Sequence, residues 1–296
     1  MFLKKYLKTF IQGIVVGFAL ISGMGGGTVA ILMGIYDDLI IAIADFTKHP
    51  KASLQLLIPL LIGAFVGIGA LIVPINLALR YFPFPATSLF VGLTIGGFRS
   101  LKKEVQGHAN TLNIVFAIIG IVFAASFGVF SFFATGGVDL SLMSPLQFLL
   151  LFVVGFAASA ALVAPGISGT LFLISIGYME EITRVIKEIL SFQNWGNNLL
   201  VAASLGLGIA VGFVVISKIM RFFLAKYKMP TYFVILGFIV GSIFACYFNG
   251  DIKSAYPASF ELGTLIASIV TLAIGIITSY YLLQLVEKKE NKSVEA

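Results

Sequence analysis

Two short loops of small and hydroxyl-bearing residues are the stretches of this sequence best suited to binding chemistry. Residues 22–28 read SGMGGGT and residues 165–170 read PGISGT, and each loop lies between two apolar segments. A loop of this kind at the start of a helix can direct backbone N–H groups and hydroxyls toward an anion. We therefore expect the two loops to hold a phosphate. The donors would come from Gly25, Gly26, Gly27, Thr28, Gly166, Ser168, Gly169 and Thr170.

The glycines of these loops also admit a simpler interpretation, in which they only permit tight turns between two helices. The hydroxyls of Thr28, Ser168 and Thr170 favour binding, because a turn alone does not need them. Pro165 suits a break in a helix, since proline fixes φ and lacks an N–H group. The loop at 165–170 is the stronger signal, because the loop at 22–28 has neither the proline nor the serine of the second loop at the matching positions.

A tyrosine and then acids follow each loop at the same distance. The tyrosine stands eight residues after the threonine of the loop, and the acids come directly after it or one residue later. One interpretation is an interfacial tyrosine anchor with solvated acids at the membrane edge. The other is that these groups gate a cavity or carry a coupling cation, because acids near a membrane cavity are functional candidates. The residues assigned this second role are Tyr36, Asp37, Tyr178 and Glu180.

The composition is that of an integral membrane protein. The 296 residues are 59% hydrophobic and 11% charged, with a mean hydropathy of +1.06, whereas soluble domains have about 25% charged residues. The 31 glycines and 28 phenylalanines are typical of tightly packed membrane helices. The net charge of +6 comes from residues in loops and at the ends. It therefore indicates membrane topology, and we expect no nucleic-acid partner.

Several classes of function lack the residues they need. The single Cys246 excludes an internal disulfide, and neither His49 nor His108 has a second ligand type at a useful spacing, so we expect no metal and no cofactor. No Ser/His/Asp order, phosphate loop with its lysine or His pair at helical spacing is present, so we expect a protein that is not an enzyme. Residues 1–22 resemble a signal peptide, but a similar segment recurs at 152–164, so we expect the N-terminus to be retained.

Hydrophobic segments predict an all-α chain that crosses the membrane repeatedly. A bilayer core of about 30 Å needs about 20 helical residues. The expected spans are roughly 54–79, 86–101, 111–133, 198–220, 231–248 and 262–285. Two further apolar regions, 9–46 and 146–182, are each interrupted by one of the loops. The apolar segment before each loop is short for a full span.

The two halves of the chain resemble each other. A shift of 142 residues places Thr28 on Thr170 and Tyr36 on Tyr178. A shift of 145 residues superimposes further pairs, which are Gly63 and Gly208, Gly67 and Gly212, Pro85 and Pro230, Gly92 and Gly237, and Gly96 and Gly241. The nearly constant offset indicates an internal duplication. We therefore divide the chain into a first repeat, 1–140, and a second repeat, 141–296.

The distribution of positive charge predicts the topology. If 9–46 and 146–182 are hairpins that enter and leave on one side, 15 of the 19 Lys and Arg residues share a side with both termini. The positive-inside rule then favours cytoplasmic termini. Each half has one re-entrant hairpin and three spans, so the second half is inverted relative to the first. Inverted repeats with interrupted helices are a transporter architecture.

Three arginines are candidates for the capture of an anionic headgroup, namely Arg99, Arg80 and Arg184. Arg99 stands with Lys102 and Lys103, and this cluster is also what an ordinary cytoplasmic flank looks like. Its alternative role is to bind a lipid phosphate. Arg80 and Arg184 are more informative, because they lie on the side that positive residues otherwise avoid.

The paired loops and the residues after them resemble a family of bacterial and archaeal membrane proteins, the polyprenyl-phosphate (undecaprenyl-phosphate) translocases. The first loop of that family usually reads PGVSGGT followed by GIYE, where this chain has SGMGGGT and Gly34-Ile35-Tyr36-Asp37. The second usually reads PGISGS followed by GYxE, where this chain has PGISGT and Gly177-Tyr178-Met179-Glu180. The resemblance covers nearly the whole chain. Ser22 and Gly25 depart from the pattern.

The resemblance implies a flippase of the bacterial plasma membrane. It would return undecaprenyl phosphate from the outer to the inner leaflet for reuse in cell-envelope synthesis, by alternating access coupled to H⁺ or Na⁺. The residues by themselves indicate an inverted-repeat membrane protein with a buried anion site. They leave open a small-anion or amino-acid transporter and an intramembrane lipid-phosphate phosphatase. They also leave the oligomeric state open, a homodimer included.

Overall fold

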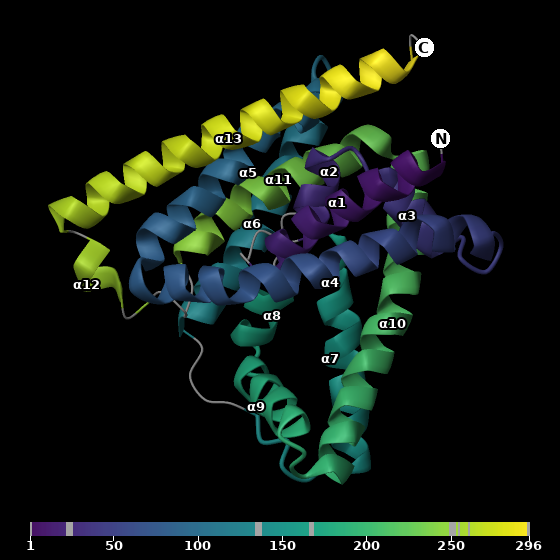
Figure 1. Cartoon of the computed structure of the whole chain (residues 1–296), viewed down its shortest axis with the longest axis vertical. Helices are drawn as coiled ribbons and strands as arrows, with labels where there is room; N and C mark the ends of the chain where they lie inside the picture. The colour runs from purple at the N-terminus through teal and green to yellow at the C-terminus, as the bar shows by residue number, and fades with distance from the viewer. Residues whose placement is uncertain are drawn as a thin grey trace.

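The computed structural model of the chain is helical, with no strand in the part that it describes (Figure 1). That part comprises residues 2–21, 26–133, 138–165, 169–248, 253, 255–259 and 261–294. The helices are α1 (Phe2–Ile21), α2 (Gly26–Leu32), α3 (Tyr36–Ala44), α4 (Pro50–Tyr81), α5 (Pro83–Val105), α6 (Thr111–Phe133), α7 (Pro145–Val163), α8 (Gly169–Ser175), α9 (Met179–Leu190), α10 (Trp195–Lys226), α11 (Lys228–Tyr247), α12 (Tyr256–Ser259) and α13 (Leu262–Val294). The all-α class is confirmed.

The lengths and hydropathy of the helices identify a multi-pass membrane protein. Among the described residues, six helices are long and apolar enough to cross a membrane, namely α4, α6, α7, α10, α11 and α13. All but α7 coincide with spans expected from the sequence. The remaining expected span, 86–101, lies in α5, whose apolar stretch Pro83–Phe98 is shorter than these six. Conversely, α7, which precedes a loop and was expected to be short for a full span, is long and apolar enough to cross a membrane.

Each of the two interrupted regions forms three helices. In the first, α1 is followed by α2, which has only seven residues, and then by α3. In the second, α7 is followed by α8, also of seven residues, and then by α9. The sequence did not separate the third helix of either set, and α9 continues to Leu190, beyond the expected end of the second region at residue 182.

Glycines bring the long helices into backbone contact. A Cβ atom on Gly13 of α1 would lie 2.2 Å from the carbonyl oxygen of Leu60 in α4, and one on Gly17 would lie 2.3 Å from that of Ala64. Similar contacts join α7 to α10, α5 to α13 and α6 to α11. Close approach through small residues is how helices associate in lipid, where burial of apolar surface gives little net gain.

These contacts also fix the direction of the paired helices. Gly63 of α4 faces Phe10 of α1, and Gly67 faces Ile14, so the two helices run in the same direction. Gly208 and Gly212 of α10 face Phe152 and Phe156 of α7 in the same parallel manner. Figure 1 shows each pair side by side. Because α4 starts at the end where α1 starts, the chain must come back to that end through α2 and α3.

A backbone hydrogen bond supports the same return in the second region. The N–H group of Val138, which precedes α7, donates to the carbonyl oxygen of Gly177, which follows α8, at 3.1 Å. The chain before α7 and the chain after α8 are therefore neighbours. Both interrupted regions leave from and return to one end of their long partner helix.

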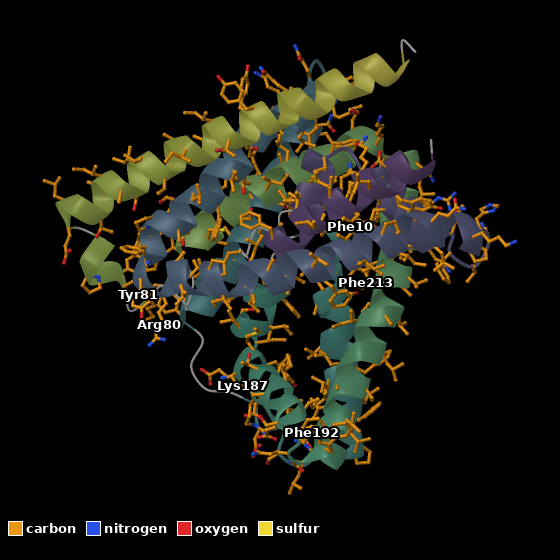
Figure 2. All side chains as sticks on the ribbon, viewed as in Figure 1. Phe10, Arg80, Tyr81, Lys187, Phe192 and Phe213 are labelled. Atoms are coloured by element: carbon orange, nitrogen blue, oxygen red, sulfur yellow. The ribbon has the colours of Figure 1, made fainter. Side chains whose placement is uncertain are left out.

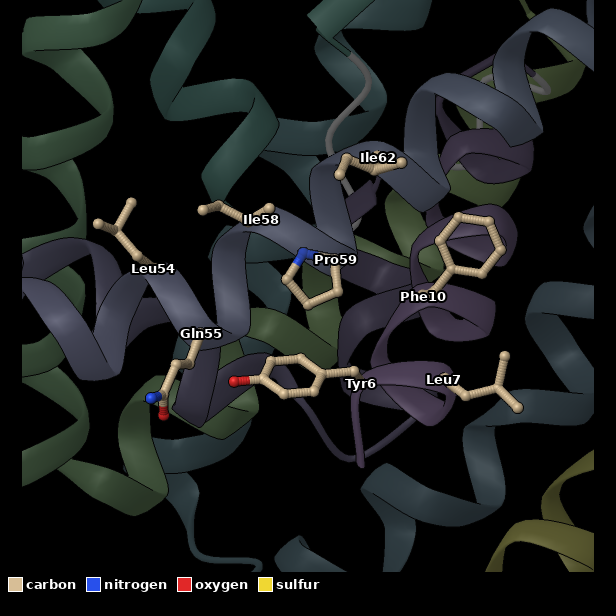
Figure 3. Close-up of a pocket in the computed structure, with 8 residues that line it drawn as sticks. All are labelled: Tyr6, Leu7, Phe10, Leu54, Gln55, Ile58, Pro59 and Ile62. Carbon is tan, nitrogen blue, oxygen red and sulfur yellow. The ribbon is translucent and has the colours of Figure 1, made fainter. Parts of the chain in front are cut away.

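The buried core lies where α1, α2, α3, α4, α5, α7 and α11 meet, while the outer surface is apolar. Ile40, Ile235 and Ile239 are almost completely buried in this core. Phe65 and Phe130 are more than 60% exposed, as side chains facing lipid would be. A surface pocket of about 580 Å³ between α1 and α4 belongs to this outer face (Figure 3). Its lining is almost entirely apolar, so it does not suit a phosphate.

The close contact at Gly208 gives a test of this packing. Replacing Gly208 with Ala puts a Cβ atom 2.1 Å from the carbonyl oxygen of Phe152, so we expect a loss of about 1–3 kcal/mol of stability. Gly206 lies on the same helix with nothing within 4 Å of its added Cβ. Gly206→Ala should therefore be neutral or slightly stabilising. Thermal unfolding in detergent measures both, and equal effects would contradict the packing described.

Candidate functional site

The first loop and the helix break of the second region meet at the centre of the molecule. Helix α2 begins at Gly26, and a Cβ atom on Gly27 would lie 3.1 Å from the carbonyl oxygen of Val163 and 3.2 Å from Pro165. Val163 is the last residue of α7, so residues 136 positions apart in the sequence are in contact. Thr28, the next residue of α2, is fully buried.

The second loop is placed only in part. Helix α8 begins at Gly169, where an added Cβ atom would lie 2.9 Å from the side chain of Leu162 in α7. Gly25, Gly166 and Ser168 lie outside the described residues, and so does the side chain of Thr170. Of the expected phosphate donors, the structure therefore places Gly26, Gly27, Thr28 and Gly169. The starts of α2 and α8 both pack against the last part of α7.

Tyr36 links the first region to the break in α7. Its hydroxyl donates to the carbonyl oxygen of Val163 at 3.1 Å, and the tyrosine is only 3% exposed. The last carbonyls of a helix have no partner within that helix, so this hydroxyl satisfies one that would otherwise stay unpaired.

Tyr178 does not mirror this role. It is half-buried and packs beside Leu140, Leu151 and Val185 in a small apolar cluster at the far end of α7. Only one of the two predicted tyrosines therefore reaches across to the opposite half of the chain. The sequence alone gave both tyrosines the same expected role.

Asp37 lines a small polar pocket at the end of α2. The pocket, of about 150 Å³, is lined by Ile31, Gly34, Tyr36, Asp37, Leu101, Glu104 and Tyr232. The hydroxyl of Tyr232 donates to Oδ2 of Asp37 at 3.4 Å. Burial raises the pKa of Asp37, while the hydrogen bond from Tyr232 and the charge of Lys228 oppose that rise. The carboxyl group therefore takes up a proton more readily than an aspartate that is free in solution.

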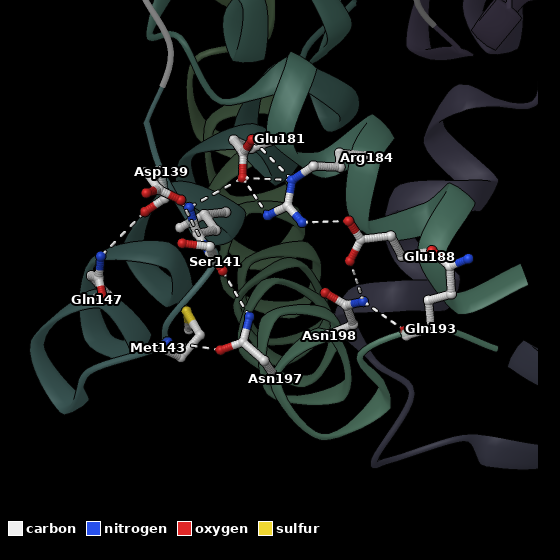
Figure 4. A network of polar contacts seen from close by, with 11 residues as sticks. Asp139, Ser141, Met143, Gln147, Glu181, Arg184, Glu188, Gln193, Asn197 and Asn198 are labelled. Atoms are coloured by element: carbon white, nitrogen blue, oxygen red, sulfur yellow. Dashed lines mark hydrogen bonds and ion pairs between the residues drawn. The ribbon is translucent and has the colours of Figure 1, made fainter. Parts of the chain in front are cut away.

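Of the two acids that follow Tyr178, the one that makes hydrogen bonds is Glu181. It accepts hydrogen bonds from Arg184 at 2.6 Å and from the N–H group of Leu140 at 3.1 Å (Figure 4). The hydrogen bond from Arg184 is the main reason that the pKa of Glu181 is lowered. Glu180, which the sequence proposed, is exposed. The spacing after Tyr178 could not distinguish the two neighbours.

The candidate headgroup-capturing arginines have different surroundings. Arg184 is bound by both Glu181 and Glu188 at 2.6 Å, so two carboxylates already neutralise its charge. Arg80 is exposed in the last turn of α4, with its guanidinium carbon 5.9 Å from the ring centre of Tyr81 (Figure 2). The side chain of Arg99 lies outside the described residues. Of Arg80 and Arg184, the structure therefore leaves Arg80 more accessible.

Sequence reasoning missed several residues of this region. Tyr232 and Glu104 join the pocket of Asp37 from α11 and α5, and the carbonyl of Val163 accepts the hydrogen bond of Tyr36. No spacing signal marks them, because each comes from a segment distant in sequence. The expected duplication gave no guide either. The offset of 145 pairs Tyr232 with Thr87, so the first half has no matching tyrosine.

The chain is similar in sequence to known transporters. A family model described as undecaprenyl phosphate translocase-like matches residues 16–259. A polyprenyl-phosphate transporter of Staphylococcus aureus is 30% identical over 235 residues, which are 77% of this chain and 81% of that protein. A polyprenyl-phosphate transporter of Vibrio cholerae serotype O1 is 26% identical over 259 residues, covering 80% and 76%. No solved structure matches.

Replacing Tyr36 with Phe tests the link to α7. The buried carbonyl of Val163 would lose its donor, so we expect a loss of about 1–3 kcal/mol of stability. Tyr81 is 66% exposed at the surface, and Tyr81→Phe should leave the stability unchanged. Thermal unfolding of both variants in the same detergent makes the comparison. A Tyr36→Phe protein as stable as its parent would mean that the bond contributes nothing.

Replacing Asp37 with Asn tests the raised pKa. Between the ordinary aspartate pKa of about 3.9 and the raised value, the folded chain keeps a proton that the unfolded chain has lost. The stability from this proton is complete below the ordinary pKa and disappears as the pH rises through the raised one. The unfolding temperature of Asp37→Asn minus that of the parent should therefore increase with pH. For the neighbouring Asp38→Asn, which does not line the pocket, a similar increase would contradict the assignment to Asp37.

Proposed function

This chain belongs to the undecaprenyl phosphate translocase-like family, and from that premise we propose that it is a transporter that moves polyprenyl phosphate between the two leaflets of a membrane. Both relatives are named for the transport of polyprenyl phosphate. The lipid of this chain would be undecaprenyl phosphate, carried from the outer to the inner leaflet of the bacterial plasma membrane and reused in cell-envelope synthesis. Transport rather than catalysis is the function proposed.

The architecture that we propose for this transporter is an inverted repeat. Helices α1 and α4 run parallel, as do α7 and α10, so each half has one re-entrant hairpin in this proposal. Helices α6 and α11 are also parallel, because Ala117 faces Gly237 and Ile121 faces Gly241. One residue separates α4 from α5 and α10 from α11, which favours reversal at both points. If the chain reverses at these points and between α5 and α6, α4 runs in the same direction as α6, and α10 runs against α11. Because α6 and α11 are parallel, α4 and α10 then have opposite orientations.

The observation that carries the proposal is the meeting of the two interrupted helices. Gly27 lies against Val163 and Pro165, and Tyr36 ties the start of α3 to the end of α7. Irregular backbone at membrane depth is tolerated only where protein covers it or where it lines a wet cavity. Two such breaks in contact, near a buried threonine, are the place in the described chain best equipped to hold a phosphate.

The proposed mechanism concerns the phosphate head, because the isoprenoid tail is soluble in lipid. An ion at the centre of a bilayer costs several kcal/mol or more. In our proposal, N–H and hydroxyl groups at the starts of α2 and α8 replace the water around the phosphate. The tail stays in the bilayer through a side opening between the two halves. Movement of one half against the other then exposes the head to each side in turn.

A cation is proposed to accompany the phosphate. A phosphomonoester carries about −1.5 to −2 charge, and its inward movement opposes the membrane potential by about 2.3 kcal/mol per charge per 100 mV. With both termini in the cytoplasm, Asp37 lies on the cytoplasmic side, where its raised pKa suits the carriage of H⁺. Glu180 remains the proposed counterpart in the second half, although its neighbour Glu181 has the stronger contacts.

Replacing Thr28 with Val tests the phosphate site, because it removes a hydroxyl and keeps the side chain's volume. In proteoliposomes loaded with undecaprenyl phosphate, we expect transport to fall about tenfold or more, as for the loss of a hydrogen bond to a charged group. Ser168→Ala and Thr170→Ala should act in the same direction. Thr183 bonds only within its own helix α9, and Thr183→Val is the matched control.

The same preparation distinguishes the alternatives. Inorganic phosphate released from the lipid would identify a phosphatase, and competition by soluble anions would identify a small-anion transporter. Full transport by Thr28→Val together with Ser168→Ala and Thr170→Ala would exclude the loops from the mechanism.

A further inference from the structure

Among the described residues, the ion pairs that join the first half to the α10–α11 region lie at one end of the molecule. There Asp45, at the C-terminus of α3, forms an ion pair with Arg221 near the end of α10. Resting on the proposed function, we propose that α3 is a gate on the side of the chain termini. In this proposal the Arg221–Asp45 pair locks it closed in the state described.

The position of Asp45 explains why it needs a partner. It is the C-cap residue of α3, and its N–H group bonds the carbonyl of Ile41. A negative charge at a helix C-terminus is unfavourable, because the carbonyl ends there are themselves negative. Lys48 lies 3.7 Å away but is 71% exposed, whereas the carboxylate is only 13% exposed. Arg221 therefore supplies the main compensating charge, and it comes from the opposite half of the chain.

Two more contacts close the same end. Tyr232 of α11 donates to Asp37 of α3, and Lys228 lies 3.5 Å from Glu104 at the end of α5. Both contacts border the pocket at the end of α2. While α3 stays against α10 and α11, this layer stands between the start of α2 and the solution at that end. Opening on this side would require Asp45 to leave Arg221.

The other end of the molecule is arranged differently. The charged groups of α9 bond within residues 138–198, as Arg184 does with Glu181 and Glu188, and Glu188 with Asn198 (Figure 4). Among the described residues, no ion pair joins α9 to α4. Figure 2 shows Arg80 on α4 and Lys187 on α9, which are the helices that correspond to α10 and α3 in the expected repeat.

The sequence repeat identifies the residue of the second half that takes the place of Asp45. A shift of 142 residues places Lys187 where the first half has Asp45. If α9 approached α4 as α3 approaches α10, Lys187 would come toward Asn76, which the offset of 145 pairs with Arg221, and Arg80 stands four residues later, so neither position carries an acid. Lys187 would therefore meet no carboxylate there, so the far end lacks the lock. The closed state at the end of the termini is therefore the favoured one in the absence of lipid.

A charge-swap experiment tests the lock. In a Cys246→Ala background, Ile31→Cys places a thiol in the pocket behind α3, and a polar maleimide applied to protein in nanodiscs reports its accessibility. We expect Arg221→Glu or Asp45→Arg alone to raise the labelling rate about two- to tenfold, in keeping with a partly exposed ion pair. The double variant Asp45→Arg with Arg221→Glu should restore slow labelling.

Lys51→Glu is the matched control, because it makes the same change of charge on an exposed residue near the start of α4. It should leave the labelling unchanged. Unaltered labelling in both single reversals, or fast labelling in the double variant, would overturn the proposal. The readout needs no undecaprenyl phosphate, so slow labelling restored by the swap, without any transport of undecaprenyl phosphate, would refute the proposed function and leave the gate intact.

A second measurement covers the case in which a charge reversal does not fold. Asp45→Cys and Arg221→Cys, in the Cys246→Ala background, can be joined by a short bifunctional thiosulfonate and released by a reductant. We expect transport of undecaprenyl phosphate to stop on cross-linking and to recover after reduction. Transport that continues through the cross-linked protein would show that α3 and α10 need not separate, and would overturn the lock.

Discussion

A helix that ends inside an apolar protein leaves backbone groups without partners, and this constraint shapes the centre of the molecule. Helix α7 ends at Val163, and the carbonyl oxygen there accepts a hydrogen bond from Tyr36. An unpaired buried carbonyl is costly where no water can reach it. The break in the second half is therefore stabilised by a side chain of the first, and that is what brings the two interrupted helices together.

Glycine contacts determine how the rest of the chain surrounds this centre. In lipid, burial of apolar surface gives helices little reason to associate, so close contact of backbones must supply the attraction. Gly13 and Gly17 against α4, and Gly155 against α10, are contacts that any larger side chain would prevent. Because the paired helices run parallel, the short helices α2 and α8 have to carry the chain back. The packing of long helices thus creates the interruptions that the proposed site requires.

The charged groups separate the two ends of a molecule whose halves have similar sequences. At the end of the molecule where both termini lie, the ion pair of Arg221 and Asp45 joins helices of different halves. At the other end, Arg184 and Glu188 hold α9 within its own half. A transporter with two equivalent closures would use matching contacts at both ends. In the gate that we propose, this difference favours closure at the end where the termini lie, which the duplication in the sequence does not suggest.

The sequence by itself determined the membrane class, the helical composition and most of the spans, because hydropathy over some twenty residues depends only on local composition. The span 111–133 even agrees with α6 at both ends. It also marked the two loops and the tyrosines after them. Only the tertiary structure decided that Tyr36 crosses to α7 while Tyr178 does not, that Glu181 is engaged rather than Glu180, and that Tyr232 joins Asp37. Those choices depend on contacts between residues far apart in the chain, and no local pattern encodes which of two similar side chains will find a partner.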